Sequence, residues 1–304
     1  MAARRAVHRA GIPSHPEEPL TMEDELTIAL DAQTRLAVTA ADCTAAAGSL
    51  ARAHLSGPTA SHYLAQALAG VALLGSECSE DDETVTFRLD CPGPLEGFLA
   101  EATVAGTLRG YTKKKILDDF DGLGAPKDPV VLGASGTFEV IRSVPGKILG
   151  SGAVAVGIAK RQAVASGLDA YFAQSLQRRV RTAVVSAAGD DGVPVYARGL
   201  MVECPPDGDA DAFARAVELF ASGAAAKALS SATVSFRALL RKLGLPQAEI
   251  RSAKPLSFAC RCSAERASAM LAALPPAERA SLPSEVDVTC HMCGRTWTVG
   301  VANG

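Results

Sequence analysis

The chain has 304 residues, of which 48% are hydrophobic and 21% are charged, and its formal net charge is -3. This length and composition indicate ordinary globular protein, with room for one large domain and a small one. The weakly acidic balance argues against a broadly basic, nucleic-acid-binding surface. The sequence has no apolar run of the ~18 residues that a membrane span requires and no apolar signal-peptide stretch at its start, so we expect a cytoplasmic protein without a membrane partner.

Residues 1–24 are rich in Pro, His and charge and are predicted to form a disordered arm. A strand pair is predicted over 25–38, followed by helices over 40–55 and 61–75, with Ser61 as the N-cap and Gly75 as the stop of the second helix. One more helix is predicted over 161–178. Short β-type runs separated by Gly and Pro then predict mainly antiparallel strands at 84–89, 106–111, 137–141, 153–158, 182–187 and 199–204.

A turn-rich segment at 205–211 precedes apolar residues at helical spacing, first from Phe213 to Ala224 and then from Leu239 to Leu243. Pro246 is predicted to begin a further helical turn. The sequence therefore predicts an α+β fold in four parts. These are the arm at 1–24, a mainly antiparallel-sheet core domain with packed helices at 25–204, a helical linker at 205–256, and a small zinc-binding domain at 257–304.

The eight cysteines divide into two groups. Cys43, Cys78, Cys91 and Cys204 are scattered and are expected to be small buried hydrophobic residues. The other four form a Cys-Arg-Cys pair and, 27 residues later, a Cys-His-Met-Cys pair. Two close pairs supply the tetrahedral thiolate set that Zn²⁺ prefers, with Zn–S distances of about 2.3 Å. We predict one Zn²⁺ per chain in the reduced state, held by Cys260, Cys262, Cys290 and Cys293.

The predicted zinc domain has the elements of a small metal-organised unit. Ser263 is expected to cap a helix, Val286, Val288, Trp297 and Val299 are expected to form two strands, and Gly294 is expected to let the Cys-His-Met-Cys turn curl. Most such sites are purely architectural. The Cys-Arg-Cys pair is unusual, however, and the short spacing within each pair makes a disulfide feasible if the metal leaves. Spacing alone leaves inert structural zinc and a redox-active centre both open.

Four co-linear motifs, spanning about residues 25–299, resemble the Hsp33 family of redox-regulated chaperones. The C-terminal one combines FACRCSAERASAMLAALP with VDVTCHMCGRTWTV, and the others are GPLEGFLAEATVAGTLRGY (93–111), DAYFAQSLQ (169–177) and YARGLMVECPP (196–206). Three places depart from the family pattern. Leu176 replaces the usual Glu, the stretch 147–156 lacks an aromatic residue, and 244–257 lacks an acidic run.

The resemblance implies a holdase chaperone of the oxidative stress response, not an enzyme. It implies that the four thiolates hold zinc in the reduced, inactive protein. Peroxide or hypochlorous acid would form the disulfides Cys260–Cys262 and Cys290–Cys293, release zinc and unfold the linker. The exposed apolar surface would then bind unfolding client proteins without ATP, and the oxidised protein would form a homodimer.

Two other functions compete with this hypothesis. A zinc ribbon that binds nucleic acid is disfavoured, because four arginines in 257–304 are balanced by four acidic residues. A thiol–disulfide oxidoreductase using the Cys290–Cys293 pair would place that pair at a helix N-terminus, but a β-type run follows Gly294. A Gly-rich stretch at 150–155 nominally fits a dinucleotide fingerprint, but its Val-rich continuation favours a strand.

Overall fold

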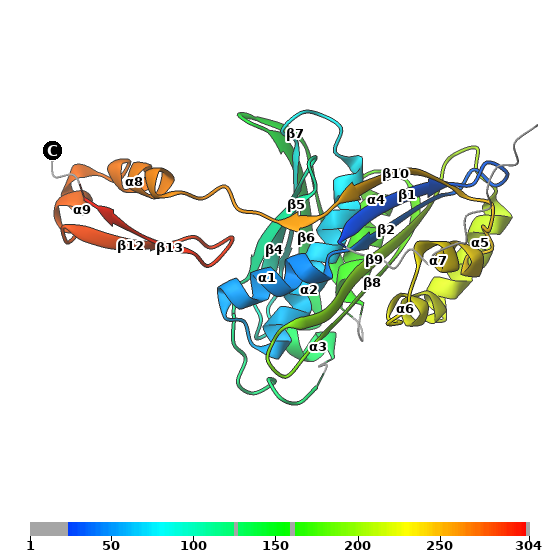
Figure 1. Cartoon of the computed structure of the whole chain (residues 1–304), viewed down its shortest axis with the longest axis horizontal. Coiled ribbons are helices and arrows are strands. Elements are labelled where there is room, and N and C mark those ends of the chain that lie inside the picture. The colour runs from blue at the N-terminus through cyan, green and yellow to red at the C-terminus, as the bar shows by residue number, and fades with distance from the viewer. Residues whose placement is uncertain (1–23, 125–126, 159–161, 302–304) are drawn as a thin grey trace, which may run out of the picture.

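Two β-sheets enclose a central helix, and a slender C-terminal module extends from one side of them (Figure 1). The computed structural model describes residues 24–124, 127–158 and 162–301, so the arm predicted at 1–24 lies outside it except for Asp24. The first sheet has the order β10-β1-β2-β9-β8, formed by Glu249–Pro255, Glu25–Leu30, Ala37–Asp42, Pro194–Cys204 and Arg179–Ala188. The second has the order β11-β5-β4-β3-β6-β7, formed by Ser257–Phe258, Thr107–Thr112, Gly97–Thr103, Thr84–Asp90, Ser135–Val144 and Lys147–Gly157.

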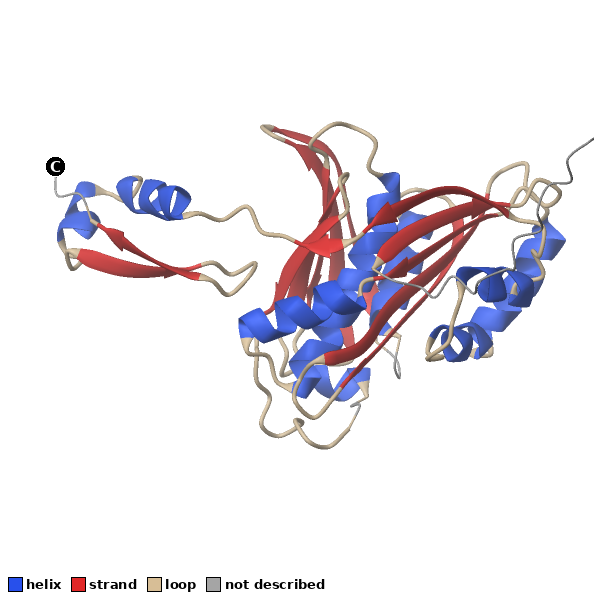
Figure 2. Ribbon diagram, viewed as in Figure 1, coloured by secondary structure: helices blue, strands red, loops and turns tan. Residues whose placement is uncertain are grey.

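Neighbouring strands in both sheets are antiparallel except β11, which runs parallel to β5. The α+β class and each predicted strand are therefore confirmed (Figure 2). The Gly-rich stretch at 150–155 lies inside β7, so the structure removes the dinucleotide-binding interpretation, which requires a helix there.

The central helix α2 (Pro58–Leu74) contacts strands of both sheets and is buried at every position except Pro58 and His62. A helix that is apolar on all sides is stable only when it is covered on all sides. The predicted end at Gly75 is confirmed, but the predicted N-cap at Ser61 is wrong. The helix begins one turn earlier, since Pro58 lacks the N–H that the first helical position leaves unpaired.

Two further helices flank this core, α1 (Thr44–His54) and α4 (Ala163–Gln174), and a short helix α3 (Asp128–Val131) lies below them. The predicted helices over 40–55 and 161–178 are thus confirmed with shorter bounds. Large apolar side chains from α2, α4 and the six-stranded sheet form the first hydrophobic core, with Phe87, Phe98 and Phe138 in mutual ring contact.

The predicted linker packs on the outer face of the five-stranded sheet. Its helices are α5 (Ala210–Ala221), α6 (Ala224–Leu229) and α7 (Phe236–Lys242). Together with the sheet they form a second hydrophobic core, separate from the first. The sheet side of this core contributes Ala29, Leu36, Val38, Ala40, Ala183, Leu200, Val202 and Cys204, and the largest helix side chains are Phe220, Leu229, Phe236, Leu239, Leu240 and Leu243.

The linker is helical up to Lys242, but the predicted helical turn at Pro246 is wrong. Pro246 lies in a turn, and Glu249–Pro255 forms strand β10 along the edge of β1. The unpaired backbone groups of β1 would otherwise be exposed, and an added strand satisfies them. This pairing involves residues more than 200 positions apart, so local spacing does not reveal it.

Residues 249–259, here called the strap, add an edge strand to each sheet. After β10 the chain passes through buried Leu256 into β11 beside β5. The N–H of Ser257 donates to Gly106 O at 3.1 Å, and the N–H of Ala259 donates to Leu108 O at 3.2 Å. The strap therefore runs directly from the linker to Cys260.

The C-terminal module, residues 260–301, contains helices α8 (Ala264–Ala272) and α9 (Pro276–Ala280) and the hairpin of β12 (Glu285–Thr289) and β13 (Thr296–Gly300). Ser263 Oγ accepts the N–H of Arg266 at 3.2 Å, which confirms the predicted N-cap. The two strands predicted around Val286, Val288, Trp297 and Val299 are confirmed, and in their register Val286 pairs with Val299 and Val288 with Trp297. In the three described ranges, no helix is long and apolar enough to cross a membrane.

Two matched substitutions test the separation of the cores. Leu68→Ala in α2 and Leu229→Ala in α6 each remove a fully buried side chain, which destabilises by about 2–5 kcal/mol. We expect Leu68→Ala to lower the midpoint of global chemical unfolding. Leu229→Ala is expected to raise hydrogen exchange only in 210–245. A global loss of the same size from both variants would show that the linker and the core unfold as one unit.

Candidate metal centre

The four paired cysteines come together in one cluster. Their Sγ atoms all lie within 4.8 Å of one another. Two of the contacts join one pair to the other, with Cys260 Sγ 3.8 Å from Cys290 Sγ and Cys262 Sγ 3.4 Å from Cys293 Sγ. A tetrahedron of sulfurs about 2.3 Å from a central ion has edges of about 3.8 Å. The cluster therefore has the dimensions of a four-thiolate metal site.

The backbone around the second pair forms a closed turn. The N–H of Gly294 donates to Cys290 O at 2.8 Å, and the N–H of Cys290 donates to Arg295 O at 2.8 Å. Gly294 has φ of 71°, in the left-handed region that glycine adopts without strain. The curl expected at this glycine is confirmed. On the other side of the cluster, Cys262 immediately precedes the capped start of α8.

Crowding of the sulfurs shifts their pKa values in different directions. Burial raises the pKa of Cys260, but the N–H of Cys262, the guanidinium of Arg109 and the neighbouring thiols lower it more, to about 7. Burial raises the pKa of Cys290 and of Cys293. Adjacent thiolates repel one another, so a full set of four requires a cation among them. The donor set thus fits a bound metal ion, which supplies that charge.

The module has almost no apolar core of its own. In the described stretch 257–301, the buried residues are Ala267, Cys293, Val299 and Val301. The indole N–H of Trp297 is buried without a hydrogen-bond partner, although Arg295 stacks over the ring at 5.4 Å. The Trp297 side chain as a whole is only half-buried. So small a unit needs a metal or a disulfide to fold.

The module rests on the core through β5 and the end of α1. A Cβ at Gly294 would lie 2.4 Å from Ala53 O, so the turn fits tightly against α1. His291 is exposed, and its ring meets the ring of Tyr111 edge-on, with ring centroids 5.8 Å apart. A cleft of about 520 Å³ at this junction is lined by Ala53, Phe258, Ala259, Cys260, Cys262, Cys293, Gly294 and Arg295. Small solutes can therefore reach three of the sulfurs.

The four scattered cysteines stand apart from this cluster. Cys43 and Cys204 are buried, as predicted, whereas Cys78 and Cys91 are half-buried against the first core. Burial raises the pKa of all four thiols, which disfavours the reactive thiolate form. Their expected role as small apolar residues fits this environment.

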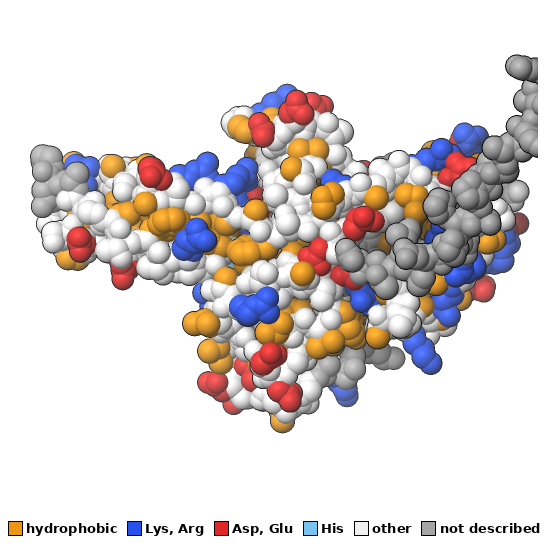
Figure 3. Space-filling model, viewed as in Figure 1, with side chains coloured by type: hydrophobic (Ala, Val, Ile, Leu, Met, Phe, Trp, Pro, Cys, Tyr) orange, Lys and Arg blue, Asp and Glu red, His pale blue; other side chains and the backbone are white. Residues whose placement is uncertain are grey.

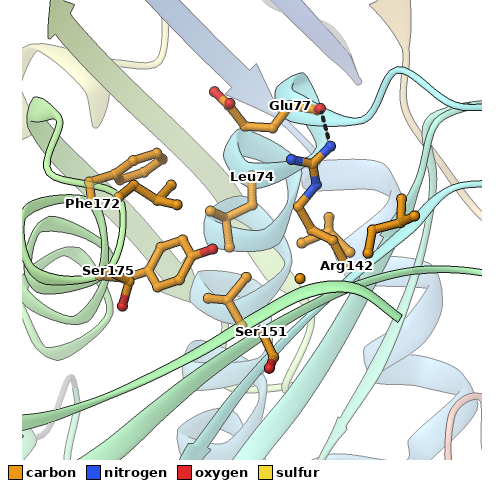
Figure 4. A pocket seen from close by; sticks show the side chains of 12 residues that line it. Leu74, Glu77, Arg142, Ser151, Phe172 and Ser175 are labelled. Carbon is orange, nitrogen blue, oxygen red and sulfur yellow. Dashed lines mark hydrogen bonds between the residues drawn. The ribbon is translucent and has the colours of Figure 1, made fainter. Parts of the chain in front are cut away.

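A second concavity, of about 270 Å³, lies between α2, β7 and α4 (Figure 4). Leu149, Gly150, Ser151 and Leu176 line it, so two of the three departures from the family pattern meet here. Arg142 at its rim donates to Glu77 O at 2.9 Å and pairs with the fully buried Glu83 at 2.7 Å. Since that cation is already paired, the pocket offers apolar surface rather than a binding site for an anion.

These features define an α+β protein of two sheets whose C-terminal module carries a four-thiol centre. Residues 24–299 match the family model described as Hsp33 protein, and the chain belongs to the Hsp33 family. This confirms the resemblance drawn from the motifs and places the chain in a family of chaperones rather than enzymes.

Individual relatives agree along nearly the whole chain. The 33 kDa chaperonin of Symbiobacterium thermophilum is 29% identical, covering 91% of this chain and 94% of the relative. That of Thermus thermophilus is 28% identical, covering 86% and 80%. The crystal structure of the 33 kDa chaperonin of Thermotoga maritima has a TM-score of 0.75 at 20% identity, covers 91% of this chain and 94% of that one, and shows the same fold.

Substitutions at two glycines can test the contact between the Cys290–Cys293 turn and the end of α1. Gly294→Ala and Gly146→Ala both introduce a side chain at positive φ, 71° and 79°, but nothing lies within 4 Å of the new Cβ at Gly146. The shared backbone strain is roughly 1–2 kcal/mol. We expect only Gly294→Ala to lower the melting temperature of the module. The measurement is thermal unfolding monitored by the fluorescence of Trp297, the single tryptophan of the chain. Equal behaviour of the two variants would contradict the contact with Ala53.

Proposed function

We propose that this protein is a redox-regulated holdase whose reduced form carries one Zn²⁺ on Cys260, Cys262, Cys290 and Cys293. The observation that carries the proposal is the gathering of four sulfurs at the end of the strap. Zinc is the metal that a closed set of four thiolates selects in a structural site. The bound ion supplies the positive charge that holds the sulfurs together. The free thiols and the family suit a reducing, cytoplasmic compartment.

In the proposed mechanism, oxidation forms a disulfide within each close pair, Cys260–Cys262 and Cys290–Cys293. Each disulfide forms as two thiolates lose two electrons, and one hydrogen peroxide takes those electrons with two protons from solvent to give two waters. A disulfide sulfur carries no negative charge for the metal, so zinc leaves. Cross-links between the pairs would keep the module closed, whereas disulfides within each pair leave its two halves unconnected.

Loss of the metal reaches the linker through the strap. Zinc binding contributes about 10–16 kcal/mol to the folding of small zinc domains, and this module has few buried residues to replace it. Once residues from Cys260 onward unfold, the strap has no folded element holding its end against β5. Separation of β11 from β5, and then of β10 from β1, would leave the C-terminal end of the linker helices without a fixed attachment to the sheets.

The surface that this release exposes suits a holdase. The linker helices are only 12, 6 and 7 residues long, too short to persist alone in water. Their departure uncovers the apolar outer face of the five-stranded sheet together with their own Phe and Leu side chains. A contiguous apolar surface of this kind binds unfolding proteins, and pairing of two such faces supports a homodimer of the oxidised form.

The competing functions gain no support from the site. The Cys290–Cys293 turn joins two strands of a hairpin and does not head a helix, unlike the low-pKa thiol of an oxidoreductase. Acidic and basic side chains are interspersed over the module on the face seen in Figure 3, whereas a phosphate backbone selects a basic stripe. The redox-regulated holdase is therefore the function that we propose.

Peroxide treatment tests the proposal directly. We expect two equivalents of hydrogen peroxide per chain to release one zinc, form two disulfides and confer suppression of client aggregation, all reversed by a thiol reductant and zinc. A variant with Ser at Cys78 and Cys91 serves as the control and should respond like the wild type. Zinc release without any change in client aggregation would refute the switch.

The strap has a test that leaves the four sulfurs intact. Ser257→Pro removes the N–H that donates to Gly106 O, whereas Ser257→Ala keeps it. We expect Ser257→Pro to retain zinc yet expose 205–248 to limited proteolysis several-fold faster than Ser257→Ala does, because β11 is weakened. If both variants resist the protease equally in the reduced state, the strap does not support the linker.

A further inference from the structure

Three consecutive residues of β5 all contact the C-terminal module. The guanidinium of Arg109 donates to Cys260 Sγ at 3.8 Å, and the N–H of Gly110 donates to Met292 O at 3.3 Å. The ring of Tyr111 meets that of His291. Met292 and His291 are the two middle residues of the Cys290–Cys293 turn, so this tripeptide touches both halves of the cluster.

Gly110 fits this position for reasons of space. A Cβ there would lie 2.5 Å from Leu99 O on the neighbouring strand. Its carbonyl oxygen is also in use, bonded at 2.9 Å to Nε2 of the buried His54. Both backbone groups of this glycine are therefore occupied, one toward α1 and one toward the module.

A chain of charges joins the tripeptide to the other cysteine pair. Glu101 on β4 accepts from Arg109 Nε at 2.7 Å and from the guanidinium of Arg261 at 2.8 Å. The side chains of Glu101 and Arg109 are only 12% and 17% exposed. Arg261 directly follows Cys260, so Cys260 is held through its own sulfur and through its neighbour.

We propose that Arg109–Tyr111 and Glu101 form the docking site by which the core holds the metal-bearing module, and that Arg109 is a positioning residue for Cys260. This inference rests on the proposed function, since the bound metal is what keeps the docked module folded. The same strand holds the strap through Gly106 O and Leu108 O. The residues that hold the strap (106–108) and those that hold the module (109–111) are therefore adjacent in the sequence, so loss of the module from β5 would directly affect the neighbouring contacts of the strap.

The experiment compares Arg109→Gln and Arg109→Lys with Arg88→Gln in the full-length reduced protein. Arg88 is a matched control, because it also lies on a strand of this sheet and pairs with Glu139 at 2.9 Å, away from the module. Zinc affinity is measured by chelator competition, and docking by hydrogen exchange of the Gly110 and Ala259 amides. Removing a partner of a metal ligand typically weakens metal affinity 10–100-fold.

We expect Arg109→Gln to bind zinc about 10-fold or more weakly and to exchange both amides rapidly even with zinc bound. In the wild type, rapid exchange should appear only after zinc is removed. Arg109→Lys keeps the charge and should recover part of both properties, and Arg88→Gln should match the wild type. Wild-type zinc affinity and zinc-dependent protection in Arg109→Gln would overturn the docking site alone. A wild-type protein without zinc would overturn the proposed function, and this inference with it.

Discussion

The structure of the C-terminal module depends on the mutual approach of four sulfur atoms. With four buried residues between 257 and 301, the module lacks the apolar burial that normally offsets chain entropy. Thiols at 3.4–3.8 Å contacts are also mutually unfavourable once ionised. An ion among them resolves both problems, because it neutralises the thiolates and joins α8 to the hairpin. In the proposed switch, the stability of the module therefore depends on the chemical state of its cysteines.

The folding of the C-terminal module is coupled to the rest of the protein through the edge strands β10 and β11. The strap supplies one of the two edge strands of each sheet, β10 and β11, and both are paired on one side only, as are the opposite edge strands β8 and β7. Edge strands are the first to separate from a sheet, since fewer hydrogen bonds and side chains hold them. The strap contributes Leu256 and the half-buried Phe258 to the first core, but the helix α2 at the centre of that core is enclosed by both sheets. In the proposed switch, release is thus confined to the linker side, and the first core remains folded.

The sequence alone predicts the parts of this molecule that local spacing determines. Strands such as β3 and helices such as α4 follow from alternation and from spacings of three and four, and the cysteine pairs follow from ligand chemistry. β10 could not be predicted, because its conformation is set by the free edge of β1 far away in the sequence. The contacts of Arg109 and Glu101 with the cysteine module were likewise missed. The Arg-Gly-Tyr motif was their signal, but its meaning depends on which element packs on β5.

The two cores also differ in how they can respond to a loss of support. The first contains five fully buried aromatic side chains, Tyr63, Phe87, Phe98, Phe138 and Phe172, and is closed on all sides. The second is one sheet face covered by short helices, with many Ala residues among its contacts. Small side chains bury little area, so each linker helix gains a modest free energy from packing. In the proposed switch, such a cover can detach without unfolding the sheet beneath it, so the exposed face would keep a fixed shape for binding client proteins.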